Sequence, residues 1–98
     1  MARIELLPDV FEDLDRIFDH LAQRDIDGAP GRVAEILAAI EVLARNPQIS
    51  RPARDDKRAL VIGAGSRGYV ALYLYVPELD AVFVLALRAP NEAGYKRV

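Results

Sequence analysis

The stretch YVALYLYV, residues 69–76, sets the frame for the rest of the sequence. In an extended strand its side chains alternate, so that the three tyrosines share one face while Val70, Leu72 and Leu74 share the other. Residues 81–88 are similarly apolar on two faces, apart from Arg88. Strands of this kind lie inside a sheet that is covered on both sides. We therefore predict two strands, at 69–76 and 81–88, with at least one of them internal.

Upstream, the hydrophobic pattern changes from a period of two to the helical period. Residues 3–7 form a short strand pattern that Pro8 stops. An apolar stripe at helical spacing then predicts an amphipathic helix from Pro8. Its members are Phe11, Leu14, Ile17, Phe18 and Leu21.

A break at residues 25–30 separates this helix from a second one. Pro30 suits the first turn of a helix, where its missing N–H has no partner in any case. The second helix is predicted at 31–45, before Asn46 and Pro47 end it. Residues 46–57 are polar and basic, which is typical of a surface loop, and a further strand is expected at 59–62.

The resulting order of elements is βααβββ, an α+β fold in which a helical hairpin packs on one face of a small antiparallel sheet. We expect the strand after the hairpin to run antiparallel to the first strand. Because the hairpin can cover only one face, the other must be shielded by a C-terminal segment, a second copy or a binding partner. The pattern thus indicates an interaction partner.

Length and composition restrict the functional classes. With 98 residues and no cysteine, the chain predicts a single domain over 1–98, stabilised by packing alone. It contains no pattern of a signal peptide or membrane span, so we expect a cytoplasmic protein with no membrane role. Residues 1–48 hold ten acidic and five basic residues, and residues 49–98 hold five acidic and eight basic ones. The net charge of −2 argues against a protein devoted to gripping nucleic acid, although the basic half permits it locally.

Several motifs have a structural explanation. GAGSRG, residues 63–68, matches the G-x-G-x-x-G pattern, but a strand follows it where a dinucleotide site needs a helix. We interpret it as a hairpin loop and predict no cofactor. Asp9, Glu12 and Asp13 are interpreted as a solvated, acidic helix start in which Glu12 can pair with Arg16.

Metal and hydrolase sites are equally unsupported. His20 is the only histidine and has no cysteine nearby, so we predict a partly exposed helix residue and no metal site. Neither Ser50 nor Ser66 has a histidine in a context that suggests a nucleophile and its base.

A basic cluster remains toward the C-terminus. It could bind phosphate, stack a base and support RNA cleavage, or it could be only a solubilising tail. Arg88 could instead be a buried structural arginine paired with a carboxylate such as Glu92. We assign no catalytic residue. The candidate target-facing residues are Arg67, Arg88, Tyr95, Lys96 and Arg97.

Three stretches in this order resemble the RelE/ParE superfamily of bacterial toxins over nearly the whole chain. The first, Leu7 to Phe18, resembles the first-helix pattern of the ParE branch, and 46–52 resembles its post-helix loop. The third, 58–73, resembles the central hairpin, with 82–88 as the last strand. The resemblance implies the toxin of a type II toxin–antitoxin module, which arrests growth unless a cognate antitoxin lays a segment along its apolar surface.

The resemblance leaves two targets open. RelE toxins cut messenger RNA on the ribosome with basic sheet residues and a C-terminal tyrosine, whereas ParE toxins inhibit DNA gyrase. Tyr95 matches the tyrosine, but Val70 stands in place of a strand arginine, and Val61 and Gly63 stand in place of lysines. Asn91 also replaces an arginine of many relatives. These departures favour a gyrase inhibitor that is not an enzyme and meets DNA only through gyrase or the antitoxin.

Two alternatives stay open. The chain could be a ribosome-dependent messenger RNA endoribonuclease with the ribosome as partner, or an inactive relative that still binds the antitoxin.

Overall fold

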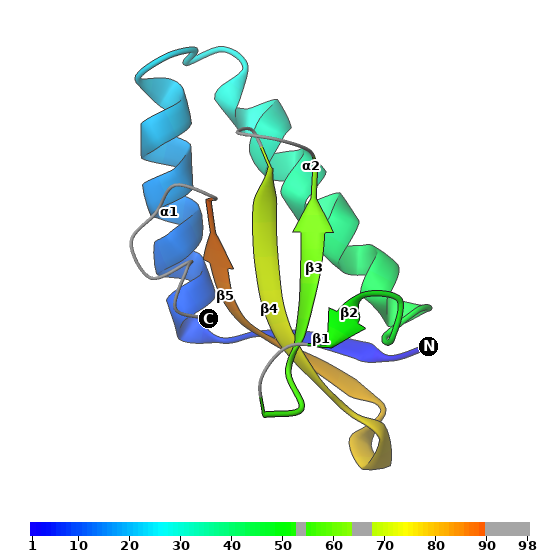
Figure 1. Cartoon of the computed structure of the whole chain (residues 1–98). Coiled ribbons are helices and arrows are strands. Elements are labelled where there is room, and N and C mark those ends of the chain that lie inside the picture. Colours follow the sequence, from blue (N-terminus) through cyan, green and yellow to red (C-terminus); the bar gives the residue numbers. More distant parts are fainter. Residues whose placement is uncertain (53–54, 64–67, 90–98) are drawn as a thin grey trace.

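The computed structural model describes residues 1–52, 55–63 and 68–89. A helical hairpin lies on one side of a five-stranded sheet (Figure 1). The elements are β1 (Arg3–Leu6), α1 (Pro8–Ala22), α2 (Ala29–Glu41), η1 (Val42–Ala44), β2 (Arg51–Pro52), β3 (Arg58–Ile62), β4 (Tyr69–Val76), η3 (Pro77–Leu79) and β5 (Ala81–Arg88). The α+β class and the order of the predicted elements are confirmed. The second helix ends earlier than expected, at Glu41, and continues as the 3₁₀ helix η1.

The sheet is mixed, which corrects the expectation of an antiparallel one. Its strand order is β1-β5-β4-β3-β2, and β1 pairs in parallel with β5, from Arg3 opposite Ala81 to Leu6 opposite Val84. The other pairs are antiparallel, so β3 runs in the same direction as β1 and not against it.

The segment after α2 explains this direction. The chain leaves η1 beside the start of β1, where the Ala2 N–H donates to the Ala44 carbonyl at 2.6 Å. The predicted loop 46–57 then contains the short strand β2, which pairs antiparallel with β3. The chain therefore reverses once more before β3 begins.

The core lies between the hairpin and one face of the sheet. The predicted alternation of β4 is confirmed, since Tyr69, Ala71 and Tyr73 are buried in this core. The stripe of α1 is shifted from the prediction, because Val10 is fully buried whereas Phe11 is 55% exposed. The largest fully buried side chains are Tyr73, Ile36, Ile40, Leu43, Leu87, Val10, Val82 and Val84.

A β-bulge in β5 changes which residues face the helices. Leu72 pairs with Ala86, but Tyr73 pairs with Val84, so Leu85 has no partner in β4. Val84 and Leu87 are consequently both buried, although they are three positions apart. The bulge thus turns Leu87 toward α1.

The turn at Gly63 and the position of His20 agree with the sequence. Gly63 has φ 80°, the positive value that the predicted glycine-rich hairpin loop requires, and most of the remaining loop lies outside the described residues. His20 is exposed on α1, as expected. Within the ranges given above, no helix is both long enough and apolar enough to cross a bilayer.

Candidate protein-interaction site

Only one residue of the predicted basic cluster can be placed. Arg67, Tyr95, Lys96 and Arg97 lie outside the described residues. Arg88 closes β5 with its side chain 31% exposed, and its guanidinium contacts the carboxylate of Asp13 at 2.7 Å. The partner that we considered for Arg88 was Glu92, which lies outside the described residues. A common basic surface of these five residues stays a prediction.

Asp13 is the centre of a polar cluster between α1 and β5. The side chain is 6% exposed, which corrects the interpretation of the acidic group as a solvated helix start at this position. One carboxylate oxygen accepts from Arg16 at 2.8 Å, and the other accepts from the Leu87 N–H at 2.9 Å and from Arg88. We call Asp13, Arg16, Leu87 and Arg88 the Asp13 cluster.

The position of the Asp13 cluster follows from the strand register. β1 ends opposite Val84, so beyond this point no strand borders β5 on that side among the described residues. The Leu87 amide would otherwise be left without a partner in a largely buried place, which is costly. The α1 carboxylate takes the place of the missing strand, and both arginines also donate to the Leu87 carbonyl, at 3.3 Å from Arg16 and 2.9 Å from Arg88.

The environment of Asp13 favours the charged carboxylate. Burial alone raises the pKa of Asp13, but the Leu87 hydrogen bond and the two guanidinium groups outweigh it, so that the pKa lies below its ordinary value. The carboxylate is therefore a charged structural element that holds the end of β5 on α1.

The sheet face opposite the helices forms an apolar surface. Val61 is 48% exposed there, Val70 is buried at 9% exposure, and the other members are partly buried. Val61 and Val70 are direct partners across β3 and β4. We call this surface the outer sheet face; it comprises Val61, Val70, Leu72, Leu74, Val76 and Phe83. The sequence predicted that the hairpin covers only one face, and among the described residues both α-helices lie on the opposite side of the sheet (Figure 1).

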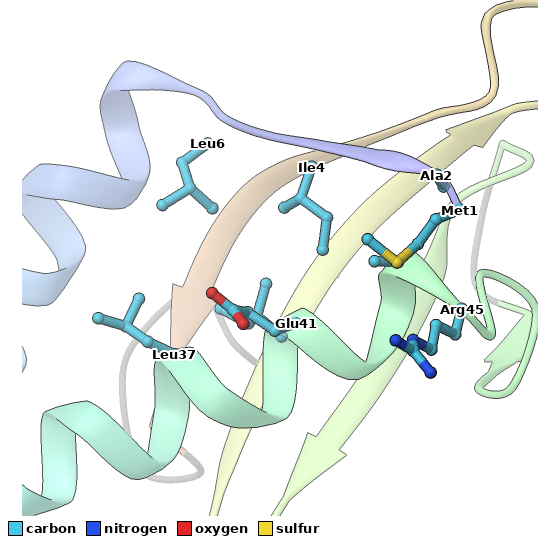
Figure 2. Close-up of a pocket in the computed structure, with 9 residues that line it drawn as sticks. Met1, Ala2, Ile4, Leu6, Leu37, Glu41 and Arg45 are labelled. Atoms are coloured by element: carbon cyan, nitrogen blue, oxygen red, sulfur yellow. The ribbon is translucent and has the colours of Figure 1, made fainter.

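A second open apolar surface was not predicted. A cavity of about 550 Å³ lies between β1 and the C-terminal part of α2 (Figure 2). Side chains from β1 and α2 face each other across it (Figure 2). We call it the β1–α2 groove; its lining is Met1, Ala2, Ile4, Leu6, Leu37, Ile40, Glu41, Ala44 and Arg45.

The groove continues past the end of η1. An adjoining cavity of about 440 Å³ shares Met1, Ala2, Ala44 and Arg45 with it and reaches Tyr75 near the end of β4 and Asp80 just before β5. At that end the Tyr75 hydroxyl donates to Asp80 at 3.1 Å, and this contact together with burial raises the pKa of Tyr75. The two cavities together run along β1, the C-terminal part of α2 and η1.

Solved structures share this fold. A chain of the chromosomal ParDE toxin–antitoxin system from P. aeruginosa is 19% identical, with a TM-score of 0.77 over 91% of this chain and 96% of that chain. The intact E. coli RelBE toxin–antitoxin complex contains a chain that is 12% identical, with a TM-score of 0.62 over 94% of this chain and 100% of that chain. A chain of the RelBE2 toxin–antitoxin complex from Mycobacterium tuberculosis is 17% identical, with a TM-score of 0.56 over 90% of this chain and 96% of that chain. No curated protein matches the chain in sequence.

These likenesses place the molecule in the RelE/ParE fold class, as the sequence suggested. A family model described as the ParE toxin of the type II toxin–antitoxin system parDE matches residues 4–92. The chain belongs to this ParE toxin family and is thus a toxin of the type II toxin–antitoxin class.

Proposed function

We propose that the chain arrests bacterial growth in the cytoplasm by inhibiting DNA gyrase through protein contacts, and that a cognate antitoxin neutralises it. One observation carries the choice of target: the arginines of the central strands are used inside the fold. Arg88 binds Asp13, and Arg58 donates to the Ser50 carbonyl at 2.6 Å. Each guanidinium is held by contacts of its Nη1 inside the fold, which makes it less available to a phosphate than an arginine without such contacts.

The outer sheet face supports the same choice. A ribonuclease of the RelE type uses basic groups on the sheet, where this chain has the Val61–Val70 pair. An apolar surface cannot stabilise the charge that develops on a phosphate during cleavage. It is well suited to another protein, because apolar area removed from water favours association.

The antitoxin partner is supported by the family and by the solved relatives, two of which are described as toxin–antitoxin complexes. A partner that covers apolar surface would also add stability to a small domain.

Three assays test the proposal. Induced expression of the chain should stop growth, and co-expression of the neighbouring antitoxin gene should restore it. The purified chain should inhibit gyrase supercoiling or trap cleaved DNA. Ribosome-bound messenger RNA should stay intact under the same conditions.

The outcomes separate the alternatives. Codon-linked cleavage of messenger RNA without an effect on gyrase would assign the chain to the RelE type of activity. Unaffected growth at verified expression, with antitoxin binding retained, would identify an inactive relative.

A further inference from the structure

We infer that the segment from Asn46 to Ser50 is a rigid docking loop, and that its Ile49 side chain inserts into an apolar pocket of the gyrase protein. We call this segment the 46–50 loop. The inference rests on the proposed function and specifies where the chain contacts its target. The loop follows η1 and leads into β2, at the edge of the sheet opposite β1 (Figure 1).

One buried tyrosine of β4 fixes the 46–50 loop to the sheet. The Tyr73 side chain is fully buried, and its hydroxyl donates to the Pro47 carbonyl at 2.9 Å. Because this bond uses the only hydrogen of the hydroxyl, Ser50 is the donor in the contact of 2.5 Å between the Ser50 and Tyr73 hydroxyl groups. Two residues of the loop are therefore bound by the same buried group.

An arginine of β3 and the backbone of the loop add further hydrogen bonds. Arg58 donates to the Ser50 carbonyl at 2.6 Å and to the Gln48 carbonyl at 3.4 Å. The Ile49 N–H donates to the Asn46 carbonyl at 3.1 Å. Each residue of the 46–50 loop thus takes part in at least one hydrogen bond, so a partner that binds the loop loses little entropy in ordering its backbone.

The side chain that this rigid loop presents to solvent is apolar. Ile49 is 60% exposed, and none of the residues 46–50 is charged. Val42, whose carbonyl accepts from the Asn46 N–H at the base of the loop, is also 46% exposed. A single exposed isoleucine is ordinary on a protein surface. Its fixed presentation on a hydrogen-bonded loop is the feature that suits a binding anchor.

Ile26 is an exposed isoleucine in a different setting. It is 62% exposed in the connection between α1 and α2, where Asp25 and Asp27 flank it. Neighbouring carboxylates oppose insertion of this side chain into an apolar pocket, because their charges would have to leave water. The residues on either side of Ile49 are uncharged, so Ile49 can enter such a pocket without burying a charge.

Shape and charge decide which partner the 46–50 loop fits. An antitoxin segment that lies along the chain needs a concave surface, and a short segment has no pocket of its own to receive a projecting side chain. A folded protein such as gyrase supplies pockets of this kind. A loop without a cationic side chain is also unsuited to the phosphates of DNA. The contact is therefore with the gyrase protein and not with the DNA that it holds.

The first test compares two isoleucines of nearly equal exposure. Ile49→Asp places a charge in the 46–50 loop, and Ile26→Asp makes the same change in the connection between α1 and α2. We expect Ile49→Asp to raise the concentration for half-inhibition of gyrase supercoiling at least about 20-fold, and Ile26→Asp to change it less than about 2-fold. Ile49→Ala, which adds no charge, should raise it about 5-fold.

Stability and antitoxin binding serve as controls for these variants. Both isoleucines are more than half exposed, so the melting temperature should stay near that of the unmodified chain. The antitoxin Kd should change less than about 2-fold in all three variants, because the loop is assigned to the other partner.

The second test separates the rigid presentation of Ile49 from the side chain itself. Tyr73→Phe removes the hydroxyl that binds Pro47 and Ser50 but keeps the buried ring. In the folded variant, exchange of the Ile49 amide hydrogen, followed by NMR, should accelerate at least about 5-fold. The half-inhibitory concentration should rise about 3-fold, because the loop must be ordered on binding.

A double variant shows whether Tyr73 acts through Ile49. In a chain that already carries Ile49→Asp, Tyr73→Phe should cause no further loss of gyrase inhibition. A tyrosine that only stabilises the fold would weaken inhibition by the same factor in both backgrounds, which would contradict the positioning role.

The outcomes distinguish failure of the inference from failure of the proposed function. An unmodified chain without an effect on gyrase would refute the proposed function, and the inference would fall with it. Inhibition by the unmodified chain that Ile49→Asp leaves unchanged would overturn the inference alone. A weaker antitoxin Kd for Ile49→Asp, with gyrase inhibition unchanged, would place the loop in the antitoxin interface instead. Equal losses of inhibition from Ile49→Asp and Ile26→Asp would indicate a general effect of added charge and would also overturn the inference.

Discussion

Two strand edges near the β1–β5 pair differ in how they are covered: one belongs to β5 beyond Val84, and the other is the outer edge of β1. Beyond Val84, no described strand borders β5 on the side of β1, and the Asp13 carboxylate and two arginines close this edge. Along the outer edge of β1, no described strand pairs with the backbone of Ile4 and Leu6 beside the apolar groove. Among the described residues, no buried polar side-chain atom lacks a hydrogen-bond partner. The Asp13 cluster therefore belongs to the scaffold, whereas no described strand covers the outer edge of β1 beside the groove.

The largest effect is expected from Asp13→Ala. The substitution leaves the Leu87 amide and two guanidinium groups without their shared acceptor. Loss of one partner in a buried charged network costs about 3–5 kcal/mol, which is a large fraction of the roughly 5–15 kcal/mol that stabilises a domain of this size. Urea unfolding at neutral pH measures the loss. Asp15→Ala, at an exposed position of the same helix, should change stability by no more than about 0.5 kcal/mol.

Arg88→Ala should cost less, about 1–3 kcal/mol, because Asp13 keeps its bonds to Leu87 and Arg16. Measuring the melting temperature beside growth arrest decides the role of Arg88. If the arginine is part of the scaffold, then lowering the temperature of the growth assay should restore toxicity to the folded variant. A stable variant without toxicity would place Arg88 on the target-facing surface.

Acid should weaken the Asp13 cluster. The pKa of Asp13 in the folded chain lies below its value in the unfolded chain, so the unfolded chain binds the proton more readily. The charged carboxylate therefore stabilises the fold above the unfolded pKa of about 3.9, and this contribution disappears as the pH falls through the folded pKa. The free energy of unfolding should fall more steeply below about pH 4 in the unmodified chain than in Asp13→Asn. If the free energy of unfolding fell equally steeply with pH in both proteins, the charged Asp13 carboxylate would not be the group that stabilises the fold.

The sequence predicted the fold class because its strongest patterns are local. The alternation of 69–76 and the helical spacing after Pro8 need no partner to be recognised. The parallel pairing of β1 with β5 could not be predicted, since it joins residues at opposite ends of the chain. The position of β1 at the edge of the described sheet, beside α2, follows from this pairing and could not be predicted either. Neither the propensity nor the spacing of Ile4 and Leu6 indicates which edge of their strand stays open.

The Asp13 cluster was missed for a different reason. We started the helical stripe at Phe11, whereas the buried one starts at Val10. Asp13 lies three residues after Val10 and four before Ile17, which puts it on the buried stripe. This spacing was the available signal. What it could not reveal is the Leu87 amide that Asp13 binds, 74 positions away, because the bulge that turns Leu87 inward is visible only in the sheet register.

The smallest effect is expected from Leu37→Ala, which tests whether the groove is open by comparison with the neighbouring residue Ile36 of α2. Ile36 is 1% exposed within the core, while Leu37 lines the groove and is only partly buried. Ile36→Ala should therefore cost about 2–4 kcal/mol through lost burial and a cavity, whereas Leu37→Ala should cost about 1 kcal/mol in the free chain. Binding of the antitoxin should change the stability cost of only one of these two substitutions. If a partner fills the groove, then Leu37→Ala should cost distinctly more in the complex than in the free chain, and Ile36→Ala should cost the same in both. Thermal unfolding of the free chain and of the complex measures both values. Equal costs for Leu37→Ala in the two states would mean that the groove stays open when the antitoxin is bound, and the contrast between the two edges would then lose its functional meaning.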